Sequence, residues 1–92
     1  MNKYQIFVSV LSETLTRKNA AYGDSAAKAP IFAPNISPEE AVFVRLGDKV
    51  SRLETLLRGT DDNGESIDDT LLDLAGYAAI LWTMRRENHE VI

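Results

Sequence analysis

Cysteine is absent from this chain of 92 residues, and glycine, proline and aromatic residues are sparse. The absence of cysteine excludes a disulfide framework and a thiolate metal site, so we expect a cytoplasmic protein. A glycine-rich phosphate loop is also missing. The one histidine, His89, has no second histidine or cysteine with which to complete a zinc site, and we interpret it as a surface residue.

An apolar segment of membrane-spanning length is missing as well. Crossing a bilayer needs about 20 apolar residues, and the most apolar segment, 71–84, is shorter and contains Asp73. Basic residues are fewer than acidic ones: the chain has 10 Lys and Arg and 14 Asp and Glu, which gives a net charge of -4. Non-specific binding to duplex nucleic acid requires a basic surface. The sequence therefore predicts no membrane span and no duplex nucleic-acid ligand, although a local basic strip can still hold one nucleotide.

What is present predicts a single all-α domain, residues 1–92, with three helices. The first helix is expected over about 3–18, where the residues of one side recur at three- and four-residue steps. These residues are Tyr4, Phe7, Leu11, Thr14 and Lys18. Lys18 ends an otherwise apolar stripe. Its ammonium either reaches water or turns towards carboxylates of another helix.

A long loop is expected over 19–37, because Pro30 and Pro34 exclude a continuous helix there. Loops of this length are often binding elements, and that is our interpretation of this one. We expect Ile31 and Phe32 to tie it to the rest of the domain.

The second helix has the best-defined start. Ser37 is a capping residue, Pro38 takes the first helical position, and Glu40 completes a capping box. One apolar seam is expected to follow, ending near Gly59. Its members are Val42, Leu46, Val50, Leu53 and Leu57.

A second capping pair, Ser66 and Asp69, predicts a third helix that runs to about Asn88. Its middle part, 71–84, is apolar on every side, and such a helix is normally surrounded by neighbours. Two other helices of so short a chain can hardly enclose it. We therefore expect a helical hairpin with a third arm that packs into an oligomeric helical bundle, with Trp82 packed within the third helix or across a subunit interface.

Two groups of charged residues are candidates for a site. Arg45, Lys49 and Arg52 share one flank of the second helix, either as a holder of polyphosphate or as a solvated basic face in which Asp48 pairs with Arg52. Asp69 and Asp73 lie one turn apart on the third helix and, with Glu65 just before it, offer oxygen ligands for magnesium.

Both aspartates of the third helix can also have a structural role instead of binding magnesium. Asp69 can simply cap the helix and oppose its dipole. Asp73 lies between Leu72 and Leu74, and a carboxylate there needs a cation or several donors. That requirement is met equally by an inter-helix salt bridge and by a ligand site.

Three ordered blocks resemble the phage and prophage family called nucleotide modification associated domain, type 1. They are residues 18–25 (KNAAYGDS), 45–53 (RLGDKVSRL) and 65–78 (ESIDDTLLDLAGYA). The layout is also similar, more distantly, to the all-alpha nucleoside triphosphate pyrophosphatases of the MazG type. The E-E-x-x-E helix of that group is not reproduced, because Phe43 stands where its last glutamate would be.

The resemblance implies a phage-type protein in a bacterial host that binds a nucleotide, with Mg²⁺ as its cofactor, and that hydrolyses a nucleoside triphosphate to the monophosphate and pyrophosphate. Lys18 and Asp73 would then be catalytic. The implied substrate-binding residues are Asn19, Tyr22, Arg45, Lys49 and Arg52, and the implied metal ligands are Asp48, Glu65, Asp69 and Asp73. Two alternatives stay open: a non-catalytic module that sequesters a nucleotide or nucleotide signal, and a structural oligomer whose charges form inter-subunit salt bridges.

Overall fold

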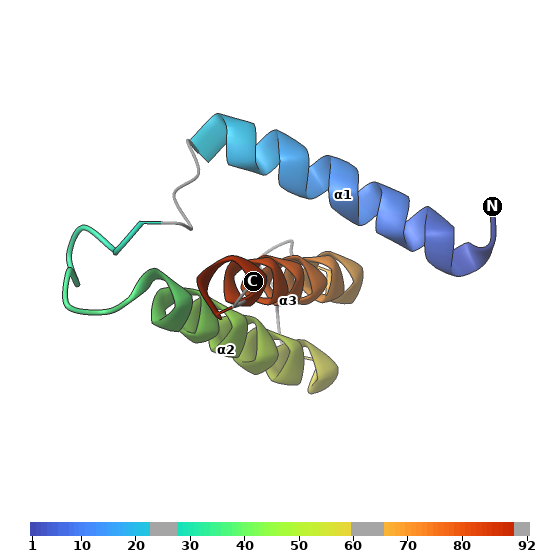
Figure 1. The fold of residues 1–92 in the computed structure, drawn as a ribbon. Helices are drawn as coiled ribbons and strands as arrows, with labels where there is room; N and C mark the ends of the chain where they lie inside the picture. Colours follow the sequence, from blue (N-terminus) through green and yellow to red (C-terminus); the bar gives the residue numbers. More distant parts are fainter. Residues whose placement is uncertain (23–27, 60–65, 90–92) are drawn as a thin grey trace.

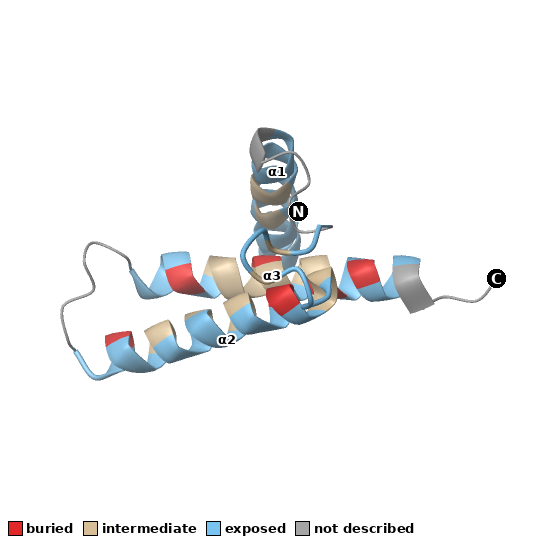
Figure 2. Ribbon diagram, turned by 90° about the vertical axis from the view of Figure 1, so that its left-hand side faces the viewer, coloured by how far each residue is buried: buried red, intermediate tan, exposed pale blue. Residues whose placement is uncertain are grey.

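The computed structural model describes residues 1–22, 28–59 and 66–89, which form the helices α1 (Lys3–Tyr22), α2 (Pro38–Leu57) and α3 (Ile67–His89). These described ranges contain no strand, so the all-α prediction with three helices is confirmed. Helices α2 and α3 lie side by side as a hairpin, and α1 is a separate arm (Figure 1). From a second direction α1 crosses the hairpin at a steep angle (Figure 2).

Each helix begins with a reciprocal pair of hydrogen bonds between a capping residue and a residue three positions later. The backbone N–H of the later residue donates to the capping side chain, and the later side chain accepts from the capping N–H. The pairs are Asn2 with Gln5, Ser37 with Glu40, and Ser66 with Asp69. The second and third pairs confirm the predicted starts, and the first was not predicted.

The helix ends are also close to those expected. Gly59, with a φ of 76° in the left-handed region, follows the end of α2. Helix α3 ends one residue after the predicted Asn88. Helix α1, however, continues four residues beyond the predicted Lys18, because the Asn-Ala-Ala-Tyr segment contains no helix breaker before Gly23.

The core lies between α2 and α3. Val42, Leu81 and Met84 are buried, and three half-buried side chains pack against them: Leu46, Tyr77 and Ile80. Two ion pairs set the antiparallel register of the hairpin. Arg85 Nη1 lies 2.6 Å from Glu39 Oε1, and Lys49 Nζ lies 2.9 Å from Asp73 Oδ2.

The predicted seam of α2 is wrong in its second half. Val50 and Leu57 are 50% and 70% exposed, whereas Leu56 is buried. Each four-residue step along a helix rotates the side chain by about 40° beyond a full turn. The residues that face α3 are therefore separated alternately by four and by three positions. That face includes position 49, and the basic side of α2 is therefore turned towards α3.

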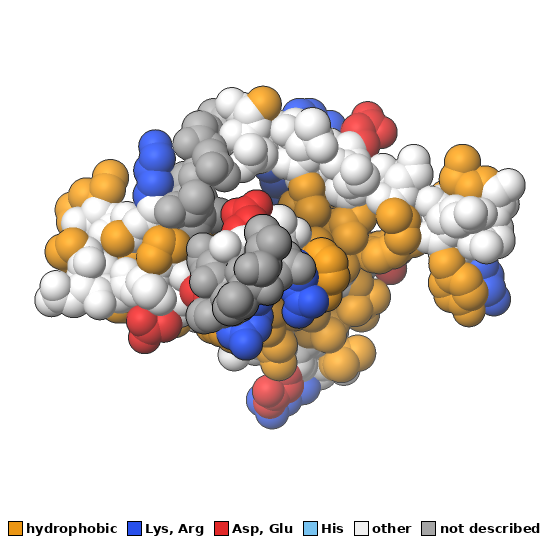
Figure 3. All heavy atoms as spheres, viewed as in Figure 1, with side chains coloured by type: hydrophobic (Ala, Val, Ile, Leu, Met, Phe, Trp, Pro, Cys, Tyr) orange, Lys and Arg blue, Asp and Glu red, His pale blue; other side chains and the backbone are white. Residues whose placement is uncertain are grey.

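Helix α1 meets α3 at one small residue. A Cβ added to Gly76, which is buried, would lie 3.4 Å from Leu15 Cδ2 and 3.9 Å from Leu11 Cδ1. Tyr4 and Phe7, further along the predicted stripe, are 70% and 44% exposed. The N-terminal half of α1 extends past the hairpin, as the right-hand end of Figure 3 shows, and its apolar side chains are largely exposed there.

The expectation that Ile31 and Phe32 tie down the loop is wrong, because these side chains are 87% and 98% exposed. The backbone around them is held locally instead, since Ala33 N–H donates to Pro30 C=O and Ile36 N–H donates to Ala33 C=O. Among the described helices, none combines the length and the apolar character that a bilayer span requires.

Candidate functional site

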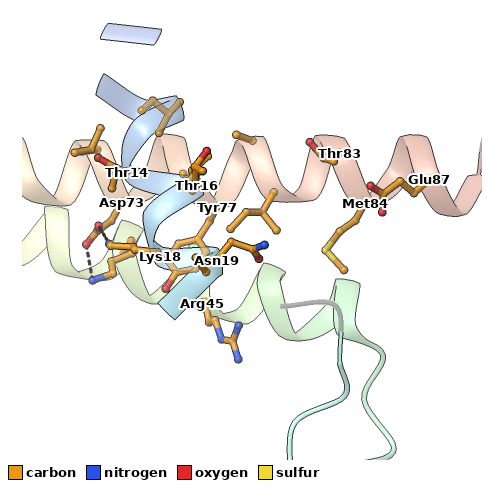
Figure 4. A pocket seen from close by; sticks show the side chains of 18 residues that line it. Thr14, Thr16, Lys18, Asn19, Arg45, Asp73, Tyr77, Thr83, Met84 and Glu87 are labelled. Carbon is orange, nitrogen blue, oxygen red and sulfur yellow. Dashed lines mark ion pairs between the residues drawn. The ribbon is translucent and has the colours of Figure 1, made fainter. Parts of the chain in front are cut away.

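An open groove of about 1010 Å³ lies where α1 crosses the hairpin (Figure 4). Gly76 lies in its floor at the crossing point, where Leu11 and Leu15 of α1 pack over α3 and leave room for no more than a small residue. The groove has a polar end, formed by the C-terminal part of α1 with α2, and a more apolar end along α3.

A three-helix ion cluster occupies the polar end. Asp73 of α3 forms ion pairs with lysines of both other helices. Lys49 Nζ of α2 lies 2.9 Å from Asp73 Oδ2, and Lys18 Nζ of α1 lies 3.6 Å from Asp73 Oδ1. The Asp73 side chain is 25% exposed and that of Lys18 is 51% exposed. Asp73 therefore makes the inter-helix salt bridge that was one of its two expected roles, and Lys18 turns towards the carboxylate rather than away from it.

Two further polar side chains line this end. Arg45, one turn before Lys49 on α2, and Asn19, next to Lys18 on α1, both line the groove. Figure 4 shows Lys18 and Asn19 near the C-terminal end of α1, with Lys18 directed at Asp73, whereas the Arg45 side chain of α2 points away from this pair. The polar end thus combines three cationic side chains with one carboxylate, in a chain whose net charge is -4.

The other end of the groove is lined mainly by apolar and hydroxyl side chains. Leu11 and Leu15 of α1 face Tyr77, Ile80 and Met84 of α3 across it. Thr14, Thr83 and Glu87 add the polar atoms of this part. An anion bound at the polar end would therefore have an apolar surface, including one aromatic ring, within the same groove.

The structure brings together part of the predicted site. Lys18, Asn19, Arg45, Lys49 and Asp73 all line the groove. The other predicted residues with described side chains, Asp48, Arg52 and Asp69, do not line it.

Those three residues have other surroundings. Asp48 is exposed on α2 and Arg52 is half-buried on the same helix. Asp69 caps α3, because its backbone N–H donates to Ser66 Oγ at 3.0 Å and its carboxylate accepts from Ser66 N–H at 3.4 Å. The capping role expected for Asp69 is therefore the one observed.

Two predicted residues lie outside what the structure describes. Glu65 falls between the described ranges, and Tyr22 belongs to α1 but its side chain is not among those described. The roles predicted for these two residues stay predictions. The same holds for His89, which ends α3 without a described side chain.

The described residues do not fit the four-ligand magnesium set as a group. Across residues 1–22, 28–59 and 66–89, no three acidic or histidine side chains gather in a way that could hold a metal ion. Asp73 already faces two ammonium groups, which neutralise the charge that a divalent cation would require. We therefore derive no chemical step through a metal.

Sequence reasoning missed the residues that shape the groove. Gly76 was not singled out as a site residue, and Leu15, which packs against it, was not part of the predicted α1 stripe. Tyr77, which also lines the groove, was not assigned to a site. A glycine within an otherwise unbroken apolar helix is the signal that indicates a close helix crossing.

Comparisons of the chain with protein-family models, with curated proteins and with solved structures give no match. The resemblance of blocks 18–25, 45–53 and 65–78 to a phage family therefore stays an expectation. The groove itself joins parts of all three blocks, since Lys18, Lys49 and Asp73 come from one block each.

Proposed function

We propose that the protein binds a nucleotide in the groove between α1 and the α2–α3 hairpin, with the phosphates at the polar end. The observation that carries this proposal is that Lys18, Arg45 and Lys49, from two helices, line one groove in an acidic chain. Charge-assisted hydrogen bonds from such groups to phosphate oxygens are among the stronger polar contacts in proteins.

The groove also supports a base or sugar beside the phosphates. Its volume of about 1010 Å³ is at the upper end of the range of small-molecule sites. Tyr77 is half-buried and offers a ring for stacking, and Asn19 offers an amide that can both donate and accept hydrogen bonds. Asp73 holds the two lysine side chains in place before a ligand arrives, which reduces the side-chain entropy lost on binding.

The test uses two variants that remove one lysine charge each. Lys18→Met keeps an apolar stem of similar length in the groove, and the matched control Lys28→Met removes an exposed lysine that does not line the groove. We expect calorimetric titration with a nucleoside triphosphate to give about 10-fold to 150-fold weaker binding for Lys18→Met, because a charged hydrogen bond contributes about 1.5–3 kcal/mol. Lys28→Met should bind as the parent does. Equal affinities for both variants would contradict the proposal.

The same titration separates binding from metal-dependent hydrolysis. It is run with magnesium and with chelator, and the products are separated afterwards. Binding that persists in chelator without product supports the sequestering module. Monophosphate and pyrophosphate formed only with magnesium would support the pyrophosphatase expected from the resemblance, and an absence of binding to any nucleotide would leave the charges with a structural role.

A further inference from the structure

A second apolar surface lies on the face of the hairpin opposite α1. On α3 it consists of Leu71 and Trp82, 47% and 62% exposed, with Ala75 and Ala78 between them. At 100° per residue these four positions fall within about 60° of the helix circumference. The groove side of α3, at Leu72 and Gly76, and the side that packs on α2 are elsewhere on the wheel.

Helix α2 continues this surface. Phe43 and Val50 are 52% and 50% exposed, and Gly47 lies between them with nothing within 4 Å of an added Cβ. Arg45 and Lys49, which line the groove, mark the opposite flank of α2. The flanks of α2 and α3 that point away from α1 lie on the same side of the hairpin. The exposed apolar side chains of the two helices therefore form one face.

The exposed area is larger than a monomer of this size normally has. A folded monomer of this length exposes about 5,300 Å², whereas this chain exposes 6958 Å². The radius of gyration is 14.7 Å, against about 12.3 Å for a compact domain of 92 residues. The excess, about 1,600 Å² over the whole chain and partly due to the exposed α1 arm, leaves room for the roughly 800 Å² that each partner buries in a standard stable interface.

The face has a sequence symmetry that selects a second copy of this chain as its partner. About the point between Gly76 and Tyr77, Leu71 is the counterpart of Trp82 and Ala75 of Ala78. Two α3 helices related by a two-fold axis at this point would run antiparallel, and each large side chain would meet a large one while alanines meet at the axis. Alanines there allow close approach of the two backbones.

The charges at the ends of α3 complement each other in that arrangement. Asp68 in the first turn and Arg86 in the last part of α3 are both exposed and lie on the same flank of this face. Arg86 also rests over the Trp82 ring, 4.8 Å from its centroid. Across a two-fold axis, Asp68 of one copy lies near Arg86 of the other, and the acidic start of each helix is beside the basic end of its neighbour.

The register of the hairpin extends the symmetry to α2. The ion pairs of Glu39 with Arg85 and of Lys49 with Asp73 set Gly47 level with about Gly76 of α3. A two-fold axis between Ala75 and Ala78 therefore passes close to Gly47, again at a position without a side chain. Phe43 of one copy then lies level with Val50 of the other.

We propose that two copies of this chain pack hairpin against hairpin as an antiparallel four-helix bundle, with the α3 helices paired about an axis between Ala75 and Ala78. This dimer encloses the side of α3 that its own chain leaves bare. It leaves the groove on the outside of the bundle, so the proposal is independent of nucleotide binding.

The first test places a large charged side chain at the axis. Ala78→Arg is compared with Ala29→Arg, the same change at an exposed position in the segment before α2. In sedimentation equilibrium we expect the parent and Ala29→Arg to have twice the mass of one chain. For Ala78→Arg we expect the dissociation constant of the dimer to be at least about 100-fold larger. A parent that is monomeric at micromolar concentration, or an Ala78→Arg variant that associates as the parent does, would overturn the proposal.

A second test keeps the fold intact if Ala78→Arg does not fold. The chain has no cysteine, so a disulfide can form only between the cysteines that are introduced. We mix the variants Ala75→Cys and Ala78→Cys and oxidise them, with Ala29→Cys as the control. Rapid formation of the mixed disulfide dimer supports the antiparallel register, and cross-linking no faster than that of Ala29→Cys contradicts it.

Charge reversal tests the pairing of the helix ends. Asp68→Arg and Arg86→Asp should each weaken association about fivefold to tenfold, because each changes two symmetry-related pairs. The double variant should recover most of the parent affinity. Additive weakening in the double variant would show that these residues do not face each other.

Discussion

The α2–α3 hairpin and the α1 arm are both built from capped helices of similar length, yet they are held very differently. The hairpin has a buried core at Val42, Leu81 and Met84 and two cross-helix ion pairs. Helix α1 rests on α3 through Leu11 and Leu15 at Gly76 and through the ion pair of Lys18 with Asp73. The hairpin is therefore the more stable part of the chain, and α1 is the more loosely held part.

This difference follows from where the apolar side chains are placed. Helix α2 has an apolar face whose heptad spacing matches that of α3, so burial extends over much of their length. Helix α1 crosses α3 steeply (Figure 2), and a steep crossing brings only a short stretch of each helix into contact. Its remaining apolar residues, such as Tyr4 and Val8, stay exposed at 70% and 59%.

The largest effect is expected from deleting a core side chain of the hairpin. Leu81→Ala should lower the free energy of unfolding by about 2–5 kcal/mol, because Leu81 is buried and its removal leaves a cavity. Leu11→Ala in the arm should cost only about 1 kcal/mol, since Leu11 is half-buried. Urea unfolding of both variants at one fixed protomer concentration checks the ranking. Equal losses would mean that the arm and the hairpin share one core.

An intermediate effect is expected from filling the crossing point of α1. Gly76→Leu places side-chain carbons where Leu15 and Leu11 lie, so α1 must leave α3. Amide hydrogen exchange should then show protection lost in α1 and retained in α2 and α3.

Gly76→Ala is the matched control for that variant. Its Cβ would meet Leu15 Cδ2 at 3.4 Å, an ordinary van der Waals contact, and alanine favours the helix by about 1 kcal/mol over glycine. This variant should therefore keep α1 protected. Loss of protection throughout the chain in Gly76→Leu would show that the hairpin depends on the arm.

The smallest effect is expected from the helix caps, and it separates the two regions again. Ser37→Ala removes the acceptor of the Glu40 N–H and should cost about 1 kcal/mol of global stability. Asn2→Ala removes the acceptor of the Tyr4 and Gln5 N–H groups but should fray only the first turn of α1, where Tyr4 is 70% exposed. Thermal unfolding and residue-specific exchange distinguish the two results. A global loss for Asn2→Ala would contradict the picture of a loosely held arm.

Much of the local structure was predictable because it depends on neighbours in sequence. The capping boxes at Ser37 and Ser66 and the glycine after α2 predicted helix boundaries to within a residue or so. The end of α1 was predicted too early, since an apolar stripe that stops at Lys18 says nothing about where the backbone stops being helical.

The sequence predicted which types of residue form the candidate site, but only some of the individual residues that it selected line the groove. Lys18, Arg45, Lys49 and Asp73 were selected by their charge and their spacing along a helix, and they line one groove. Asp48 and Asp69 were selected by the same reasoning and lie outside it. Spacing along one helix specifies a side of that helix, but it does not specify which neighbouring helix that side meets.

The amino-acid sequence by itself determined the three helices, their caps and the apolar character of α3, because these depend on hydrogen bonds and periodicity within a few residues. Tertiary structure alone decided which side of α2 meets α3, where α1 crosses, and that Asp73 receives lysines from two other helices. These outcomes depend on contacts between residues far apart in the chain. Helices with apolar residues on more than one side can satisfy such contacts in several ways, and only the packing of the whole chain selects one.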